Sequence, residues 1–454
     1  MKDRKKVFIV VSRGGLLGKF IETGLIQALC KKDLELVVVT PFAPTSEYTE
    51  ALSGLTVSFE PLFVARLSTI RKILQEFGRA AIFNPTVRAV QMYTVASEKD
   101  PSRILFFPRR YIFPLIRFIP GIKQFLRFLN YHLDPQKQND HLFCVHKPDL
   151  VFSTTPHDES EVAMLKAARR FSIPTLCLPK SWDNLPKTLF PVKTDHILVW
   201  GEEMKKDAIK LQGFNPSEIT ITGASQFDRY AHHELLLSRE EFMRRFNLDP
   251  KKKIILYGSS GANLCDEGSY LDLIANFLKE NENVEVLIRP HSGYQDDRKR
   301  FARFTNQPGF TIDQTITQST TPQSVWDTNP ERIGNLHNSL AHADVCVNIA
   351  STLTIDALLC GTPVVNIHFD VHSDVDLKRK GVSRIFEMSY VKTLMYHRAT
   401  WEVKSKEELW GALSECLNNK NARIKQREQL IHAFAYQNDG KSTERIAAAV
   451  RSRV

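Results

Sequence analysis

Short runs of apolar residues alternate with longer amphipathic segments along the chain. Near its start, an apolar run at 6–11 is followed by the glycine-rich stretch 12–19, a helical pattern over about 20–31 and a second apolar run at 34–40. Strands that are apolar throughout and separated by helices are typical of a parallel sheet covered on both faces. The pattern therefore predicts a strand–loop–helix–strand unit, with the glycines in the loop.

This alternation occurs in two sets, which are separated by the polar stretch 226–250. Two sets of alternating strands and helices predict an α/β protein made of two Rossmann-like domains. The further apolar runs of the first set are 150–155, 174–178, 196–201 and 218–224, and those of the second set are 254–258, 284–289, 344–349 and 363–369.

A chain of 454 residues is too long for a single hydrophobic core. We expect an N-terminal domain over 1–230, a C-terminal domain over 231–425, and C-terminal helices over 426–454 that can cross back to the first domain. Ligands of such folds bind beyond the carboxyl ends of the strands. The site is therefore expected in a cleft where the two domains face each other.

Composition and charge narrow the class of protein. The run 7–11 is too short for a secretory signal, and no stretch of about 18 apolar residues predicts a membrane span. Seven scattered cysteines without metal-site spacing indicate reduced thiols in a cytoplasmic protein, with no disulfide and no bound metal. Lys and Arg outnumber Asp and Glu by 61 to 51, and this net charge of +10 indicates an anionic partner.

One segment, residues 103–132, is basic, rich in aromatic residues and free of acidic residues. Its three prolines exclude one long helix, but a short amphipathic helix fits its last part, 121–132. A surface of this composition suits an anionic membrane or a lipid-phosphate-linked acceptor. The alternative is an irregular insertion that packs on its own domain.

The stretch NIASTLTIDALLCG, 348–361, carries an unexpected carboxylate. Asp356 lies two-thirds of the way along a short predicted helix, where the macrodipole disfavours negative charge. Ser351, Thr352 and the N–H groups of the first turn would suit a phosphate. Asp356, four positions after Thr352 on the same helix face, would then accept both hydroxyls of a ribose. The alternative is an ordinary helix cap whose Asp356 pairs with a basic neighbour.

Two other loops of the second domain follow predicted strands. Arg289 and His291 end the run 284–289, where a histidine can neutralise a phosphate or protonate a leaving group. Ser259 and Ser260 lie between two glycines, and such small residues let backbone N–H groups approach a pyrophosphate. No Gly-Lys-Ser/Thr follows, so this is not a Walker loop. A structural histidine and an ordinary turn are the alternatives.

In the first domain, the glycine-rich stretch 12–19 does not match G-x-G-x-x-G, and no acidic residue ends the strand at 34–40. This pattern argues against NAD binding, although Gly15 allows a substrate to approach the backbone closely.

A second loop of the first domain follows the run 174–178. Trp182 would stack on a sugar, Asp183 would act as a general base, and Asn184 would bind substrate. The alternative is a turn in which Trp182 is packed and Asp183 is a cap. The stretch 157–159 fits helix capping, unless His157 is buried at the site.

Four pieces of the chain resemble glycosyltransferases of the GT-B architecture. They are most similar to CDP-glycerol glycerophosphotransferases and related surface-polysaccharide transferases. The resemblance implies that His291, Ser351 and Thr352 grip a nucleotide diphosphate, that Asp356 binds ribose, and that the two domains face each other across a cleft. The pieces are SWDNLPK (181–187), ITGASQFDRY (221–230), LIRPHSG (287–293) and the stretch 343–370.

Two departures from these families matter. Asp183 stands where the polymerases have a catalytic histidine, and no proline follows His291. Both departures argue against a glycerol-phosphate substrate and favour sugar transfer.

We therefore predict a metal-independent glycosyltransferase, peripheral on the inner face of the cell membrane. It would move a sugar from a nucleotide-activated donor to a hydroxyl of a surface polysaccharide (capsule or lipopolysaccharide) or a lipid-linked glycan, without a separate cofactor. Asp183 would deprotonate the acceptor, and His291 would stabilise the departing phosphate. The alternatives are a glycerophosphotransferase-like polymer synthase, a nucleotide-sugar 2-epimerase and a non-catalytic glycan- or lipid-binding assembly factor. No motif indicates nucleic-acid binding.

Overall fold

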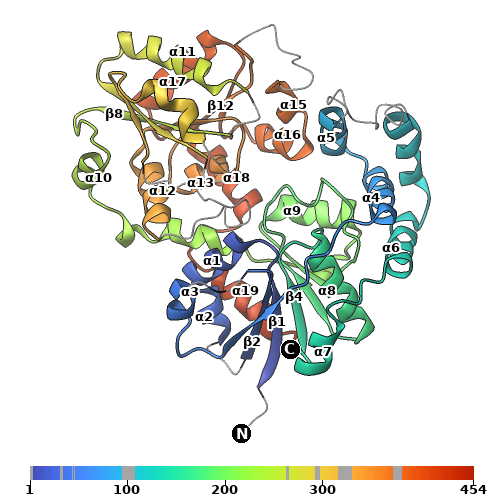
Figure 1. Ribbon diagram of the computed structural model, residues 1–454. Coiled ribbons are helices and arrows are strands. Elements are labelled where there is room, and N and C mark those ends of the chain that lie inside the picture. Colours follow the sequence, from blue (N-terminus) through green and yellow to red (C-terminus); the bar gives the residue numbers. More distant parts are fainter. Residues whose placement is uncertain are drawn as a thin grey trace. The chain divides into compact units, whose positions relative to one another are not determined.

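The protein is described by a computed structural model that covers residues 4–30, 34–42, 44, 46–94, 108–261, 265–291, 297–314, 330–371 and 381–454. The chain forms two compact units (Figure 1). Unit 1 comprises residues 1–226 together with 441–454, and unit 2 comprises residues 227–440. Residues 103–107 of the basic aromatic segment lie outside the described residues.

Unit 1 is built on a seven-stranded sheet in which all strands are parallel. The strand order is β3-β2-β1-β4-β5-β6-β7, so β1 and β4 are neighbours at the point where the chain reverses its direction across the sheet. Helices lie on both faces, and the core side chains of β1, β2 and β4 are fully buried. The strands are β1 (Lys5–Val10), β2 (Leu34–Thr40), β3 (Val57–Pro61), β4 (Leu150–Ser153), β5 (Thr175–Cys177), β6 (His196–Val199) and β7 (Ile219–Ile221).

The helices of unit 1 include π and 3-10 segments. They are α1 (Gly14–Glu22), α2 (Leu25–Cys30), α3 (Ser46–Ala51), α4 (Thr69–Ala81), α5 (Pro85–Thr94), η2 (Pro108–Ile112), η3 (Phe113–Phe118), α6 (Ile122–Leu133), α7 (Asp140–His146), α8 (Glu159–Arg170), α9 (Glu202–Asp207), η4 (Ala208–Gln212), η5 (Pro216–Glu218) and α19 (Ser442–Arg451).

The first predicted loop is mostly helix. We expected a glycine loop over 12–19 and a helix from about residue 20, but α1 begins at Gly14 and ends before Gly24, whose φ is +71°. Leu16 and Leu17 are buried by this helix. Burial of their side chains outweighs the weak helix propensity of the glycines, which the prediction had emphasised.

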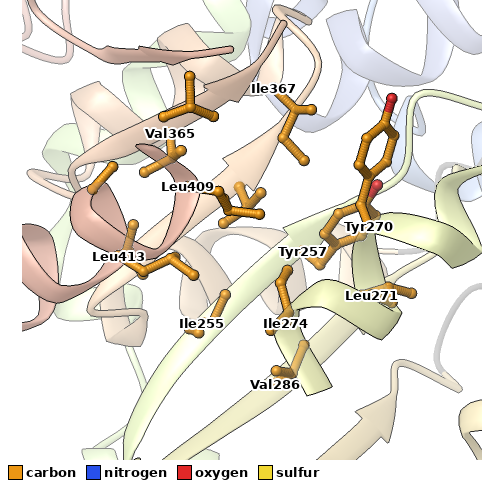
Figure 2. Close-up of a cluster of buried hydrophobic side chains, with 14 of the residues drawn as sticks. Ile255, Tyr257, Tyr270, Leu271, Ile274, Val286, Val365, Ile367, Leu409 and Leu413 are labelled. Carbon is orange, nitrogen blue, oxygen red and sulfur yellow. The ribbon is translucent and has the colours of Figure 1, made fainter. Parts of the chain in front are cut away.

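Unit 2 contains a six-stranded parallel sheet of order β10-β9-β8-β11-β12-β13. Its core joins side chains of the sheet to those of two helices, α11 and α17 (Figure 2). The prediction of two Rossmann-like α/β domains is therefore confirmed. The strands are β8 (Lys253–Gly258), β9 (Val284–Arg289), β10 (Phe310–Ile312), β11 (Val345–Asn348), β12 (Val364–Ile367) and β13 (Trp401–Val403).

Short helices connect unit 1 to the sheet of unit 2, and longer helices cover that sheet. The helical segments are η6 (Ser225–Ala231), η7 (His233–Leu235), α10 (Arg239–Arg245), α11 (Glu267–Glu280), η8 (Asp297–Phe304), α12 (Pro330–His342), α13 (Leu353–Leu359), α15 (Ser383–Phe386), α16 (Ser389–Tyr396), α17 (Lys406–Asn418) and α18 (Ile424–Ala435).

The last helix of the chain belongs to unit 1. α19 packs beside α2, where the guanidinium of Arg451 donates a hydrogen bond of 2.9 Å to the carbonyl of Ala28 (Figure 1). The preceding helix, α18, lies in unit 2. In the part of the chain that the structure describes, no helix is both long and apolar enough to cross a membrane.

One buried carboxylate fixes the central strand ends of unit 1. Glu161 of α8 is fully buried and accepts six hydrogen bonds of 2.7–3.1 Å, from the N–H and hydroxyl of Ser12, the hydroxyl of Ser153, the N–H and hydroxyl of Thr154, and the N–H of Thr155. These donors come from the last residue of β4 and from the loops after β1 and β4. The helix thereby holds both loops against the sheet.

We predict that Glu161→Gln destabilises unit 1 by about 2–4 kcal/mol, because the amide turns an N–H group toward buried donors. Equilibrium urea unfolding measures this loss. The exposed Glu50 provides a control, since Glu50→Gln removes the same charge from α3 without breaking a buried network. Equal stability of the two variants would contradict the role given to Glu161.

Candidate functional site

The central strands of unit 2, β8 and β11, bring two candidate loops together at their carboxyl ends. This is the point where the strand order reverses, and it is the place where parallel α/β sheets bind ligands. The loops approach so closely that a Cβ on Gly258 would lie 2.1 Å from Cδ2 of Leu353. A side chain at position 258 would therefore displace the end of the Leu353 side chain.

Two asparagines at matching strand ends hold the loop that precedes α13. Asn348 of β11 and Asn366 of β12 are neighbours in the sheet, and both are fully buried. Asn348 Oδ1 accepts a hydrogen bond of 3.1 Å from the Ser351 N–H, and Asn366 Oδ1 accepts one of 3.0 Å from the Ala350 N–H. The Thr354 hydroxyl contacts both amide oxygens at 3.1 Å. This clamp fixes the loop, in which Ala350 has the unusual φ of +42°.

The helix that follows differs from our expectation. α13 begins at Leu353, so Asp356 lies in its first turn and not two-thirds of the way along it. A carboxylate in the first turn is favoured by the macrodipole, and the predicted local cost is therefore wrong. The N–H of Leu353 donates to the Ser351 hydroxyl at 3.3 Å, so that hydroxyl already has a partner within the loop.

Asp356 also has a partner that the sequence did not suggest. The buried hydroxyl of Tyr230 is hydrogen-bonded to Asp356, and burial together with this negative charge raises the pKa of Tyr230 well above its ordinary value. The phenol therefore stays protonated and is the donor. A ribose-binding role for Asp356 remains a prediction.

The two serines after β8 differ in their environments. The Ser259 hydroxyl donates to the buried carboxylate of Glu267 at 2.9 Å, and the Ser260 N–H donates to the same group at 2.9 Å. Ser260 Oγ is buried and has no hydrogen-bond partner in the described part of the chain. Ser259 is thus part of the structural network, whereas the buried hydroxyl of Ser260, at the switch point of the sheet, lacks a partner among the described residues.

The strand end at Arg289 is held by acidic residues that the sequence analysis missed. The guanidinium of Arg289 forms an ion pair with Asp313, which is fully buried at the end of the next strand, β10. The N–H of His291 donates to Asp297 at 2.6 Å, and Arg300 links Asp297 (2.7 Å) to Glu267 (3.1 Å). An acidic residue directly after the apolar run 310–312 was the available signal for Asp313.

In unit 1, the loop after β5 contains a partly exposed ion pair. Asp183 is paired with Lys187. Burial alone would raise the pKa of Asp183, but Lys187, a hydrogen bond from Ser181 and the charge of Lys180 more than reverse this, so its pKa is lowered. The carboxylate is consequently ionised, and its action as a general base, which stays a prediction, would require release from Lys187.

The neighbouring candidates in unit 1 are mostly enclosed. Trp182 is only 5% exposed, which fits packing better than sugar stacking. Asn184 donates to Asp183 at 3.2 Å, while its Oδ1 is buried without a partner among the described residues. Gly15 is buried in the first turn of α1 and not in a loop.

His157 is partly buried in the loop after β4, and a ligand role for it stays a prediction. Its pKa is lowered to about 4, first by burial and then by the charges of Lys180 and Lys187, so the imidazole is neutral at physiological pH. Its ring stacks on Phe190 with a centroid separation of 6.2 Å. No cluster of three or more His, Cys, Asp or Glu residues suited to a metal ion occurs in the described ranges.

Comparison with known proteins supports the fold. No protein-family model and no curated protein matches the sequence. Solved structures similar over their whole length include the S. aureus MnaA–UDP co-structure (13% identity, TM-score 0.54, 98% of this chain and 96% of that chain) and UDP-GlcNAc 2-epimerase from Neisseria meningitidis bound to UDP-GlcNAc (10%, 0.54, 98% and 100%). A glycosyltransferase from Rickettsia africae is also similar (10%, 0.51, 100% of both chains).

At these identities the similarity shows the fold alone, and it confirms the prediction of a GT-B-like architecture of two parallel-sheet α/β domains. It does not extend to the CDP-glycerol glycerophosphotransferase family, which the sequence motifs resemble.

We predict that Gly258→Ala destabilises unit 2 by about 1–2 kcal/mol, because the new methyl group displaces Leu353 at the switch point. Gly411, in the exposed part of α17, is the matched control, since a Cβ there meets no atom within 4 Å. Gly411→Ala should leave stability unchanged or raise it by up to about 1 kcal/mol. Equilibrium denaturation compares the variants, and equal shifts would contradict the proposed contact.

Proposed function

We propose that this protein is an enzyme that acts on a nucleotide-activated sugar and binds the nucleotide at the carboxyl end of the unit 2 sheet. The observation that carries the proposal is the buried Ser260 hydroxyl, which has no hydrogen-bond partner among the described residues and lies in one of the two loops that meet at the switch point. Buried polar groups without partners are rare in folded proteins and indicate a missing ligand or water. The GT-B-like fold, which this chain shares with structures determined with UDP or UDP-GlcNAc, supports a nucleotide ligand.

In this proposal, Ser260 and His291 contact the diphosphate. Ser351, Thr352 and Ser259 shape the loop around it, and Arg289 positions the strand end through its ion pair with Asp313. Asp356 would bind the ribose hydroxyls by exchanging its hydrogen bond from Tyr230 for hydrogen bonds from the ligand.

The first candidate reaction is 2-epimerisation, in which a base removes the proton at C2 of the sugar as the bond from C1 to the diphosphate breaks. The diphosphate oxygen then adds back to C1 while a proton returns to C2 on the other face. Several of the similar structures are 2-epimerases, so the comparisons support this alternative better than the transfer reaction that we predicted from the sequence.

The second candidate is transfer, in which an acceptor hydroxyl loses a proton to Asp183 and attacks the anomeric carbon as the bond to the diphosphate breaks. A specific observation favours it. The surface of residues 108–133 exposes large apolar side chains that an epimerase of a soluble nucleotide sugar does not need: Tyr111, Ile112, Leu115, Phe118, Ile119, Phe125, Phe128 and Leu133.

Binding of UDP tests the proposal common to both reactions. We expect UDP to bind, and Ser260→Ala to weaken binding about threefold to tenfold through loss of one hydrogen bond to an anion. Isothermal titration measures the affinity. Ser383, exposed in α15, gives the control Ser383→Ala, which should bind like wild type. No binding of UDP or of another nucleoside diphosphate at millimolar concentration would refute the proposal.

Turnover separates the two reactions. With UDP-GlcNAc alone, an epimerase produces the C2 epimer, which NMR detects, whereas a transferase needs an acceptor. Binding without turnover under either condition would instead support a non-catalytic assembly factor.

We also propose peripheral attachment to an anionic membrane through the surface of residues 108–133. Its exposed apolar side chains are interspersed with cations, such as Arg117, whose guanidinium lies 4.6 Å from the centre of the Phe118 ring. The sequence contains no acidic residue from 101 to 133. Apolar side chains and positive charge together are what binding to anionic lipid requires.

The double variant Phe118→Ser, Phe125→Ser should reduce binding to phosphatidylglycerol vesicles at least tenfold, since each buried phenylalanine contributes about 1.5–3 kcal/mol. Vesicle co-sedimentation measures this change. Tyr396, 83% exposed in unit 2, provides the control Tyr396→Ser. Equal binding to purely zwitterionic vesicles, or full binding by the double variant, would count against attachment by this surface.

A further inference from the structure

The sheet of unit 1 has a switch point of its own, between β1 and β4. The loops after these strands carry Arg13 and Thr155, and Glu161 holds both loops in place. The loop after β5 joins them, because the N–H of Lys180 donates to the carbonyl of Thr154 at 3.1 Å. Three loops therefore meet at this edge, and the proposed nucleotide site in unit 2 makes no use of them.

The side chain of Lys180 is the unusual feature of this edge. It is half-buried and forms no hydrogen bond or ion pair with any residue that the structure describes. Burial, followed by the positive charge of Arg13, lowers the pKa of this ammonium group. The acidic neighbours, Asp183 and Asp158, are already paired with Lys187 and with Arg13 (3.4 Å).

Partial burial of a cation that has no partner among the described residues costs free energy, and a bound anion would lower that cost.

Three neutral polar atoms in the same loops also have no hydrogen-bond partner among the described residues. They are Oγ1 of Thr155, which is only 1% exposed, Nδ1 of His157 and Oδ1 of Asn184. The positive charges of Lys180 and Lys187 both lower the pKa of His157. Several such atoms on adjacent loops indicate a ligand that accepts and donates hydrogen bonds.

We propose that this edge of unit 1 binds a phosphoryl group, with Lys180 as the paired cation, Thr155 and His157 as hydrogen-bond donors, and Asn184 as acceptor from a hydroxyl of the same ligand. A phosphoryl group offers three oxygens in a tetrahedral array and can contact a cation and donors from separate loops at once, which a planar carboxylate does less well. The group belongs either to the nucleotide or to a second, phosphate-bearing substrate. The choice between these sources rests on the proposed function, but the anion site itself does not.

Isothermal titration of the full chain with inorganic pyrophosphate, with and without saturating UDP, tests this proposal. Lys180→Met keeps the length of the side chain and removes its charge, and it should weaken pyrophosphate binding at least tenfold. Lys180→Arg should retain most of the affinity. Lys193, which is paired with Glu218 in the same unit, gives the control Lys193→Met, with less than a twofold change expected.

The titrations with UDP identify the source of the phosphoryl group. If UDP competes with pyrophosphate and Lys180→Met weakens UDP equally, the nucleotide supplies the group. If pyrophosphate still binds to the UDP-saturated chain and Lys180→Met leaves UDP affinity unchanged, a second substrate supplies it. A wild type that binds no pyrophosphate at millimolar concentration, or a folded Lys180→Met that binds it normally, would overturn the proposal. Should Lys180→Met not fold, Thr155→Val provides the same comparison, with at least a threefold loss expected.

Failure of the proposed function has a different signature. In that case no nucleotide binds, whereas pyrophosphate binding still depends on Lys180.

Discussion

The arrangement of both units depends on one kind of interaction, a buried glutamate that accepts hydrogen bonds from the ends of the central strands. In unit 1, Glu161 saturates its two oxygens with donors from the last residue of β4 and from the loops after β1 and β4. In unit 2, Glu267 does the same for Tyr257, Ser259 and Ser260. Each carboxylate comes from the first turn of the helix that follows, so it ties helix to sheet where a ligand would bind.

Two buried arginines of the described residues also have carboxylate partners. Arg71 is buried and forms two hydrogen bonds of 2.6 and 2.8 Å with Glu159, and Arg289 is paired with Asp313. Such pairs must be complete, because a single buried charge is strongly destabilising. Against this background, the ammonium of Lys180 and the buried hydroxyl of Ser260 stand out as groups without a partner among the described residues.

The candidate residues from the sequence thus divide into two kinds. Ser259 and Arg289 are paired with buried carboxylates, and Trp182 is packed. Ser260 and Asn184 each have a buried oxygen without a hydrogen-bond partner among the described residues. The sequence could not predict this division, because nothing in it indicates that Glu267 accepts a hydrogen bond from Ser259, eight residues earlier. The case of Asp356 shows a related limit, since a shift of the expected helix start to Leu353 changes a disfavoured carboxylate into a favoured one.

By itself, the sequence determined the class of architecture, since apolar runs alternating with amphipathic segments allow only parallel strands covered by helices. It also identified the loops that carry the polar residues, because each apolar run ends where a predicted strand ends. Only the tertiary structure decided which of those residues are already partnered. Glu161 reaches Ser12 across 149 residues of sequence, which no local pattern records. Burial of Leu16 and Leu17 turned an expected glycine loop into a helix. Pairing and burial are properties of the packed chain, so only the tertiary structure shows which polar groups lack a partner and can bind a ligand.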